Sequence, residues 1–523
     1  MPVMLRRSSA PGETWDAWAA IGTLVPELDP ARRLEGLPRL LEEAFDAVAP
    51  DWLALGRSLA EGGDAVLAHA PTAAANVSDL GLMLAWSRLV AGWAMGGRRV
   101  LVVCPDPWLF RHLAALPGVE AGPPPPLAAA EAWLASRGLL ARLRVGLRMA
   151  RAALAFRRSM PPPGKVWLLV YGHPASTPEG DDAYFGSLMR EMPELHRVLH
   201  VDCGPDQARR LGEGGRTVSL HGFGSPWTAL ALWRRRWRTR PGGPLAWLIR
   251  RAAALEGGTG GPAMIAWQIH CQERFLAAAK PYRVAWPWEH HSWERAFVRA
   301  CRRQGVATLG YQHATVGWRE WNQGPDSDPA GTAGLPDRIL CVGEAYRERL
   351  VGYHVPEDVV GVAGALRYAA GRMPRFDPAA PVFVALPFDS ALAAEIVDAL
   401  RPLARKGWRF LVKDHPMTPY AFAPEPGLER SAVRLSDLEG VAAVVYCATT
   451  VGLEAVLVGL PTVRFLPAER PVLDVMPAGL TVPAATATDL EAVLAAAAPG
   501  PVLERSRVFA APDPAIWREA LFG

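Results

Sequence analysis

Residues 283–312, RVAWPWEHHSWERAFVRACRRQGVATLGYQ, decide the fold class of this chain. Two apolar runs, RVAWPW (283–288) and ATLGYQ (307–312), enclose a segment in which Trp293 and Phe297 recur at helical spacing. A strand, a helix and a second strand in this order are typical of a βαβ unit, whose two strands lie parallel in one sheet. The sequence therefore predicts an α/β protein with a parallel sheet.

Further apolar runs continue this pattern on both sides of the unit. Before the Pro- and Gly-rich stretch GRMPRFDPAAP (371–381), the added strand candidates are VWLLVY (166–171), RVLHVD (197–202), RILCVG (338–343) and VVGVAG (359–364). After it they are VFVAL (382–386), RFLVK (409–413), VAAVVY (441–446) and PTVRF (461–465), with helices expected near 390–404, 450–459 and 488–498. Two doubly wound, Rossmann-like domains that face a crevice are the expected architecture.

The pattern divides the chain into four parts. Residues 1–160 are expected to be a mainly helical, basic region with strands only at AVLAH (65–69) and RRVLVVC (98–104), and Pro161–Pro163 then stop its last helix. The other expected parts are a Rossmann-like domain at 161–372, a second one at 373–505 and a C-terminal helix at 506–523.

Composition excludes several classes of protein. The 523 residues, 50% of them hydrophobic, suffice for two or three domains of roughly 100–200 residues each. Six cysteines without a CxxC pair predict reduced thiols and no zinc site. No apolar run reaches the roughly 18 uncharged residues of a membrane span, and the first residues lack the apolar segment of a secretory signal. We therefore expect a cytoplasmic protein.

Two segments at the ends of predicted strands carry residues suited to a nucleotide phosphate. Lys413–Pro416, KDHP, begins at the last residue of RFLVK, and Cys447–Thr450 follows VAAVVY and opens a helix with Thr449 or Thr450 as its N-cap. In open α/β sheets ligands bind beyond the carboxyl ends of the strands, where helix N-termini hold anions. The expected nucleotide-binding residues are Lys413, His415, Pro416, Thr449, Thr450 and Glu454, the last for ribose hydroxyls.

These residues resemble the donor half of bacterial GT-B glycosyltransferases that use cytidine nucleotides. Sialyltransferases and capsule Kdo transferases carry an HP motif and a Ser/Thr pair there, and CDP-glycerol polymer transferases carry a related KxHP and Ser-Ser. The stretch PWEHHSWERAFVRACRRQGVATLGYQHATVG (287–317) is similar to a surface-carbohydrate biosynthesis family found in nonulosonate and O-antigen gene clusters. The resemblance covers roughly residues 165–500, and it makes 161–372 the acceptor domain and 373–505 the nucleotide-sugar donor domain.

The resemblance implies an inverting glycosyltransferase. It would transfer a CMP-activated 3-deoxy-2-ulosonic sugar, Kdo or a sialic-like nonulosonate, to a surface glycan or glycolipid. No metal or other cofactor is expected, because Lys413 and the helix N-terminus can offset the phosphate charge. Three alternatives stay open: a CDP-glycerol-type phosphotransferase, a UDP- or GDP-hexose transferase, and a non-catalytic GT-B-like component of surface-glycan assembly.

An inverting transfer needs a base for the acceptor hydroxyl. Glu289 and His313, which follow successive predicted strands, are the first candidates, and Asp182, after VWLLVY and its loop, is the next. The structural alternative for Glu289 is a cap or ion pair for the helix near Ser292. We expect no metal site, because consecutive His290 and His291 point differently. Glu294 fits the first turn of a helix, and a role in the site stays open for it.

Arginine-rich segments at 137–158 and 233–240 mix cations with tryptophan and leucine. The net charge of +4 is too small to favour nucleic-acid binding. Contact with anionic lipid at the cytoplasmic face of the inner membrane fits this composition. The alternative, solvated helix faces in an arginine-rich protein, stays open.

Overall fold

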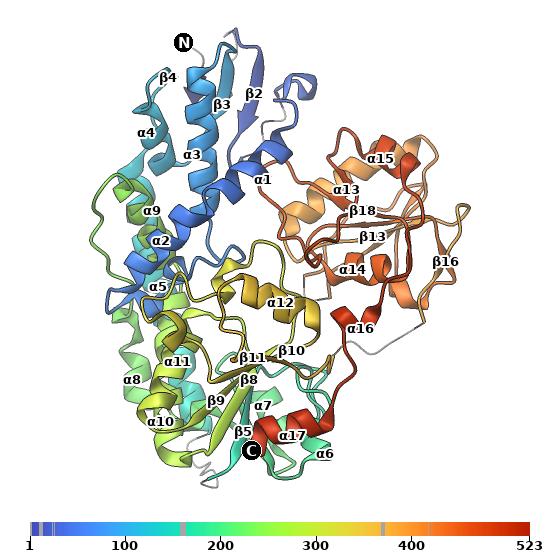
Figure 1. Cartoon of the computed structure of the whole chain (residues 1–523). Helices are drawn as coiled ribbons and strands as arrows, with labels where there is room; N and C mark the ends of the chain where they lie inside the picture. The colour runs from blue at the N-terminus through green and yellow to red at the C-terminus, as the bar shows by residue number, and fades with distance from the viewer. Residues whose placement is uncertain are drawn as a thin grey trace.

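The computed structural model describes residues 3–9, 14–23, 25, 27–156, 164–367, 372–416 and 418–523. Three parallel sheets form the centres of an N-terminal, a central and a C-terminal part of the chain. Figure 1 shows the N-terminal part above the central part, and the C-terminal part beside both. The boundary predicted at Pro161–Pro163 lies outside the described residues.

The N-terminal sheet contains four short parallel strands in the order β2-β3-β1-β4. They are β1 (Val3–Arg6), β2 (Ala17–Ala20), β3 (Val100–Val103) and β4 (Val119–Ala121). The helices of this part are α1 (Leu37–Ala47), α2 (Ala49–Ala60), α3 (Leu80–Met95), α4 (Pro107–Ala114) and α5 (Leu127–Ala155).

The strand expected at 98–104 is present as β3, but the one expected at 65–69 is wrong. Ala65–Leu67 forms a short 3-10 helix instead, and Leu67 is buried against the core of the central domain. The apolar run therefore serves packing between two parts of the chain. The strands β1, β2 and β4 were not predicted, because three or four residues are too few for a strand periodicity to stand out.

The central sheet confirms the predicted βαβ unit and extends it to seven parallel strands, in the order β11-β10-β9-β8-β5-β6-β7. The strands are β5 (Val166–Val170), β6 (Leu195–Leu199), β7 (Thr217–Ser219), β8 (Arg283–Pro287), β9 (Ala307–Gln312), β10 (Arg338–Cys341) and β11 (Val360–Val362). The helices are α6 (Leu188–Glu191), α7 (Pro205–Gly212), α8 (Pro226–Leu230), α9 (Ala246–Gly257), α10 (Gly261–Ala279), α11 (Ser292–Arg303) and α12 (Glu344–Gly352).

The C-terminal sheet has six parallel strands in the order β15-β14-β13-β17-β18-β19. They are β13 (Val382–Ala385), β14 (Phe410–Lys413), β15 (Leu428–Arg430), β17 (Val444–Tyr446), β18 (Thr462–Phe465) and β19 (Ala484–Ala485), with helices α13 (Ser390–Arg405), α14 (Thr450–Leu457), α15 (Leu490–Ala496) and α16 (Arg505–Val508). The last helix, α17 (Pro514–Phe522), returns to the central domain, where the Trp517 indole N–H donates to the Ala363 carbonyl at 3.0 Å.

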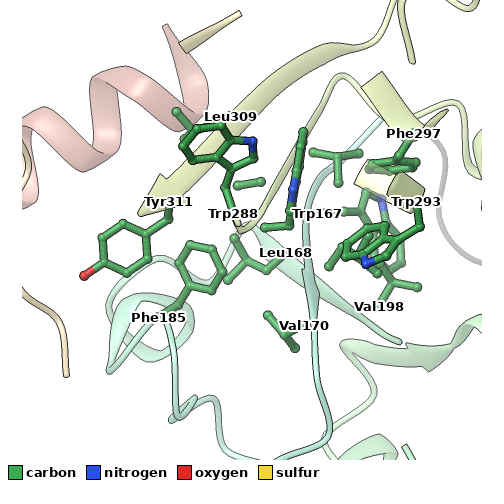
Figure 2. Close-up of a cluster of buried hydrophobic side chains, with 14 of the residues drawn as sticks. Trp167, Leu168, Val170, Phe185, Val198, Trp288, Trp293, Phe297, Leu309 and Tyr311 are labelled. Atoms are coloured by element: carbon green, nitrogen blue, oxygen red, sulfur yellow. The ribbon is translucent and has the colours of Figure 1, made fainter. Parts of the chain in front are cut away.

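Aromatic side chains fill the core beneath the central sheet. Figure 2 shows Trp167, Trp288 and Tyr311 from three of its strands or strand ends among aliphatic side chains. All three are almost fully buried, and Phe185 packs on Tyr311 with ring centroids 5.5 Å apart. Burial of such a side chain contributes about 1.5–3 kcal/mol, so this core fixes the strand ends from which the candidate site projects.

The predicted fold class, α/β with two doubly wound domains, is confirmed by these two larger sheets. Within the described ranges, no helix has the length and apolar content that crossing a bilayer requires.

Candidate active site

The carboxyl edges of the central and C-terminal sheets approach each other. The loop after β9 contacts the loop after β18, where the Trp318 N–H donates to the Asp474 carbonyl at 2.9 Å. Beside this contact a side chain at Gly317 would lie 2.6 Å from the same carbonyl, so only glycine allows the approach. The loops at the carboxyl ends of the two sheets are therefore in direct contact.

Glu42 of α1 joins all three parts of the chain. Its carboxylate accepts from Arg319, in the loop after β9, and from Arg464, in β18, each at 3.0 Å. It also accepts from the Val472 N–H at 3.2 Å. A buried carboxylate requires such compensation, and here the compensation comes from the edges of both sheets.

Glu289 leaves the central sheet through a strained turn. It lies two residues beyond the end of β8, and the next residue, His290, has a left-handed backbone with φ of 58°. Only a firmly held turn keeps a non-glycine residue in that conformation. The His290 Nδ1–H donates to the Asn322 carbonyl at 2.8 Å, and the Asn322 side-chain amide donates to the Glu289 carbonyl at 3.0 Å.

Glu294 supports the same turn from the first turn of α11. It accepts from the Trp286 indole at 2.8 Å and from the backbone N–H groups of Glu289 and His291 at 3.1 Å each. The carboxylate is buried, and burial raises its pKa. Glu294 therefore positions the Glu289 backbone and caps the helix, which answers the question left open for it.

The Glu289 carboxylate lies between two imidazoles. One oxygen pairs with His291 Nε2 at 2.9 Å, and the other lies 3.7 Å from His313 Nε2. Burial acts to raise the pKa of Glu289, but the hydrogen bond and charge of His291, with His313 and Arg367, outweigh it and lower the pKa to about 2. Its side chain stays 35% exposed, so the ionised carboxylate can meet a bound molecule.

The two histidines differ in charge. Burial lowers the pKa of His291, but its hydrogen bond to Glu289 and the charges of Glu289 and Glu294 outweigh burial and raise the pKa above the usual value. For His313 burial dominates over the attraction of Glu289 and lowers the pKa to about 4. At neutral pH the carboxylate is therefore flanked by one imidazole held towards its cationic form and one neutral imidazole.

A small cavity of about 30 Å³ adjoins Glu289 and His291. Glu320 also lines it, and burial raises the pKa of this carboxyl to about 7. Three of the lining residues carry buried polar atoms without a hydrogen-bond partner among the described residues: Trp288 Nε1, His291 Nδ1 and Gln323 Oε1. Such a concentration of unmet polar atoms marks a place completed by ligand or water.

Asp182, the third candidate base, is engaged elsewhere. Its side chain is 1% exposed and pairs with buried Arg197 of β6 at 3.3 Å. The same carboxylate accepts from the backbone of Tyr184 at 2.9 Å and of Phe185 at 3.2 Å. These contacts hold the loop after β5 in place, so we no longer regard Asp182 as a candidate base.

Two further side chains belong to this edge and were not predicted. The ring of Tyr184 lies 5.0 Å from that of His313, and the Arg367 guanidinium lies 5.0 Å from the Tyr184 ring. Tyr184 follows β5 and Arg367 follows β11, so both come from strand ends. That position was the available signal, although neither residue lies in a recognisable motif.

On the C-terminal sheet, the two predicted nucleotide-binding segments lie at the ends of β14 and β17, the strands on either side of β13. The turn between β17 and α14 contains Ala448 in a left-handed conformation, with φ of 52°. Thr449 is the N-cap of α14, yet its hydroxyl caps nothing and has no partner among the described residues. Thr450 is the first residue of the helix.

The KDHP segment is fixed by its own loop. Lys413 donates to the Ala432 carbonyl at 3.0 Å, and Asp414 pairs with Arg430 at 2.6 Å. His415 packs edge-on against Phe388, which follows β13, and partial burial lowers the pKa of its imidazole. Pro416 is exposed. Lys413 thus ties a loop to the end of β14, and the phosphate role expected of it stays a prediction.

Glu454 lies one turn into α14, half-buried, and burial raises its pKa against the opposing charges of Arg505 and Arg434. The role in ribose binding expected of it stays a prediction. The described residues contain no cluster of three or more His, Cys, Asp or Glu side chains arranged to hold a metal ion. All six cysteines are buried and unpaired.

No family model matches the chain, and no curated protein matches it. Solved structures align with it in outline. The glycotransferase of kitacinnamycin aligns with 69% of this chain and 95% of its own at 15% identity and a TM-score of 0.37. The glycosyltransferase SnogD from Streptomyces nogalater covers 69% and 93% at 13% identity and a TM-score of 0.34.

UDP-N-acetylglucosamine 2-epimerase from Rickettsia bellii covers 58% of this chain and 78% of its own at 12% identity and a TM-score of 0.34. Likeness at this level transfers no activity. The chemistry is therefore argued from the residues of this chain.

Proposed function

We propose that this chain is an inverting, nucleotide-sugar-dependent glycosyltransferase with a GT-B-like pair of domains. The observation that carries the proposal is the turn at Ala448 and Thr449. A strained backbone and an unpartnered hydroxyl stand together at a helix N-terminus, at the carboxyl end of a strand of the C-terminal sheet. Strain and unmet polar groups concentrate where a ligand completes the structure.

The proposed donor is a CMP-activated 3-deoxy-2-ulosonic sugar such as Kdo or a sialic-like nonulosonate. Its phosphate would accept from the Thr449 hydroxyl and from the first N–H groups of α14, whose dipole contributes about 0.3–1 kcal/mol. His415 and Pro416 would border the nucleotide from the neighbouring strand end, and Glu454 would accept from ribose hydroxyls. The HP and Thr-Thr residues support cytidine as the base.

Glu289 is the proposed base for the acceptor hydroxyl. It is ionised at neutral pH and more exposed than buried His313. Its low pKa makes it a weak base, which suits glycosyl transfer because the sugar develops oxocarbenium character as the bond to the leaving group breaks. His291 is then a positioning residue, since it fixes the carboxylate through a 2.9 Å contact.

A second candidate function is a CDP-glycerol-type phosphotransferase. The neutral His313 imidazole beside the Glu289 carboxylate favours it, because a carboxylate that orients an imidazole is a common general-base arrangement. In that reaction the acceptor oxygen attacks phosphorus, a phosphodiester forms and CMP leaves. His313 would take the proton.

Nucleotide binding separates these candidates. We expect CMP to raise the thermal unfolding temperature more than CDP, UDP or GDP at equal concentration, and His415→Ala to lose most of this shift while its own unfolding temperature stays near wild type. His354→Ala, at an exposed histidine of the central domain, serves as the matched control. A larger shift with CDP would favour the phosphotransferase, and no shift with any nucleotide would contradict both enzymatic proposals.

The proposed acceptor is a surface glycan or glycolipid. The proposed location is the cytoplasm, with peripheral contact to the inner membrane that supplies such an acceptor.

A further inference from the structure

The long helix α5 presents an apolar stripe to solvent. Trp133, Leu140, Leu147 and Leu154 recur every seven residues, and each is more than half exposed. Seven residues are close to two helical turns, so these side chains share one face. Gly138 and Gly146 lie on the opposite, buried face, which packs against the body of the protein.

A second exposed apolar group adjoins the stripe. Trp227 and Leu230 of α8, with Trp233 just after it, are exposed, and Trp227 is 81% exposed. The backbone of α8 packs against the buried face of α5 at Gly146, and the exposed apolar groups of the two helices meet at Leu154. A groove of about 590 Å³ is shared by Leu154, Phe223, Trp227 and Leu230. We call the α5 stripe together with these α8 residues the apolar flank.

Arginines are frequent in the segments that carry the apolar flank, and the one carboxylate of α5, Glu131, is paired with Arg250. Residues 132–178 contain no Asp or Glu, and neither do residues 214–255. The exposed arginines within the flank's own segments are Arg137, Arg144, Arg148, Arg151, Arg234, Arg235, Arg236, Arg238 and Arg240. The net charge of the whole chain is only +4, so its cations are concentrated here relative to its anions.

We infer that the apolar flank docks on the interface of an anionic lipid bilayer. A contiguous exposed apolar surface marks an interaction site. Leucine and tryptophan enter the boundary between headgroups and acyl chains, while arginines beside them pair with lipid phosphates. The α5 helix then lies along the membrane plane, with its glycine face towards the protein. Charge of one sign around the apolar side chains favours this partner over an apolar protein surface.

The apolar flank also bears on how the acceptor would reach Glu289. This second inference rests on the proposed transferase function. The 3-10 helix Leu220–Phe223, which follows the edge strand β7, packs against α5, so the flank lies at the β7 end of the central sheet. The donor domain contacts the loop after β9, towards the other end. Figure 1 shows α8 at the lower left of the molecule and α13 at the upper right. A lipid-linked acceptor held at the membrane would therefore approach Glu289 from the side opposite the donor.

Vesicle sedimentation tests the inference. Wild-type protein should bind vesicles of equal parts phosphatidylglycerol and phosphatidylcholine, bind pure phosphatidylcholine vesicles roughly tenfold more weakly, and dissociate progressively as salt screens the arginines. Leu140→Glu/Leu147→Glu should lower the partition coefficient roughly tenfold or more. Met95→Glu/Val502→Glu, which adds the same charge at two exposed apolar positions elsewhere, should bind as wild type does.

A second variant guards against misfolding. Arg234→Gln/Arg235→Gln/Arg236→Gln leaves every apolar residue in place and should lose affinity for the anionic vesicles, with its thermal unfolding temperature unchanged. The inference is overturned if wild-type protein ignores anionic vesicles at low salt, if the Leu140/Leu147 variant binds like the Met95/Val502 control, or if the flank proves to join two copies of the chain into a dimer that the Leu140/Leu147 variant dissociates.

The outcome is separable from that of the proposed function. All flank variants should keep the thermal shift given by CMP. Vesicle binding without a CMP shift would contradict the proposed transferase and leave the membrane surface standing. A CMP shift without vesicle binding would contradict the membrane surface and leave the proposed transferase standing.

Discussion

The carboxyl edges of the central and C-terminal sheets differ in how their polar side chains are held. At the carboxyl edge of the central sheet, Glu289 and Glu294 are held by imidazole, indole and backbone N–H donors. At the carboxyl edge of the C-terminal sheet, the Thr449 hydroxyl has no partner among the described residues and Ala448 is strained. One edge holds its carboxylates in a charge network beside a cavity with unpartnered polar atoms, and the other leaves a helix N-terminus without a side-chain cap.

This difference indicates a division of labour. A carboxylate that takes a proton must be aimed before the substrate arrives, because misplacement raises the barrier of the chemical step. A phosphate-binding turn works through backbone N–H groups and hydroxyls, which satisfy themselves on the ligand. In the proposed transferase, the central edge would therefore supply the reaction site and the C-terminal edge the nucleotide-binding site.

The largest expected effect is on catalytic turnover, and it comes from the charge network around Glu289. Glu289→Gln keeps the size of the side chain but removes the base and the charge that stabilises protonated His291. We expect the turnover of a CMP-sugar donor to fall about 10²–10⁴-fold, with the affinity for CMP unchanged, because general-base catalysis is worth that much. Steady-state kinetics and CMP titration measure the two quantities.

The matched control is Glu344→Gln, a carboxylate in the first turn of α12 in the same domain, which should turn over donor like wild type. If Glu289→Gln instead weakened CMP binding and spared turnover, the assigned division between the two edges would be reversed.

The next effect is on stability, and it concerns the Glu42 ion pairs that link α1 to the two sheet edges. Glu42→Gln removes the charge shared by Arg319 and Arg464, which would leave buried guanidinium groups undercompensated. We expect the free energy of unfolding to fall by about 3 kcal/mol, measured by denaturant titration. Glu43→Gln, at the exposed neighbouring position, should stay within about 0.5 kcal/mol of wild type.

Equal stability of the Glu42 and Glu43 variants would show that the central and C-terminal edges are not braced through α1. The comparison between the edges would then describe two independent domains.

Sequence predicted what depends on local pattern. The strands at 166–170 and 382–385 are uniformly apolar runs, which buried parallel strands require, and both were found. The positions of Glu289 and Thr449 followed from the rule that strand ends carry the site. These features needed no knowledge of which strands are neighbours.

Sequence failed where partners are distant. Asp182 is a structural carboxylate because Arg197 lies beside it on the next strand, and no local pattern shows that pairing. Glu42 accepts hydrogen bonds from Arg319 and Arg464, which are 277 and 422 positions away in the sequence. No local pattern could therefore predict that it joins the parts of the chain. Glu320 was missed because only tertiary burial gives its carboxyl an unusual pKa.

Glu320, at the carboxyl edge of the central sheet, predicts a smaller effect, a pH dependence of the unfolding free energy. Its pKa is about 7 in the folded chain and about 4.5 when unperturbed, so between these values the folded state holds a proton that the unfolded state releases. Stability therefore falls as pH rises from about 4.5 through 7. Glu320→Gln removes this loss, and the variant should become more stable than wild type by on the order of 2 kcal/mol at pH 8 while matching it near pH 4.5.

Denaturant titrations of both proteins across this range measure the difference. Parallel stability curves for wild type and variant would mean that Glu320 titrates normally, and the network of the central edge would then end at Glu289 and His291.

The smallest effect tests the carboxyl edge of the C-terminal sheet directly. Thr449→Val replaces the unpartnered hydroxyl with a methyl group of similar size, so the free protein has no hydrogen bond to lose and its unfolding free energy should stay within about 0.5 kcal/mol of wild type. With nucleotide present, one hydrogen bond to phosphate is lost, worth about 0.5–1.5 kcal/mol. We expect CMP affinity to fall roughly fivefold by calorimetric titration.

Thr462→Val in β18 is the control, and its expected effects on stability and on CMP affinity are the opposite of those of Thr449→Val. Its buried hydroxyl donates to the Leu460 carbonyl at 2.9 Å, away from the carboxyl edge. That variant should lose about 1 kcal/mol of stability and keep its CMP affinity. If Thr449→Val behaved like Thr462→Val, with lower stability and unchanged affinity, the Thr449 hydroxyl would be an ordinary helix cap, and the turn at Ala448 and Thr449 would lose its support as a phosphate site.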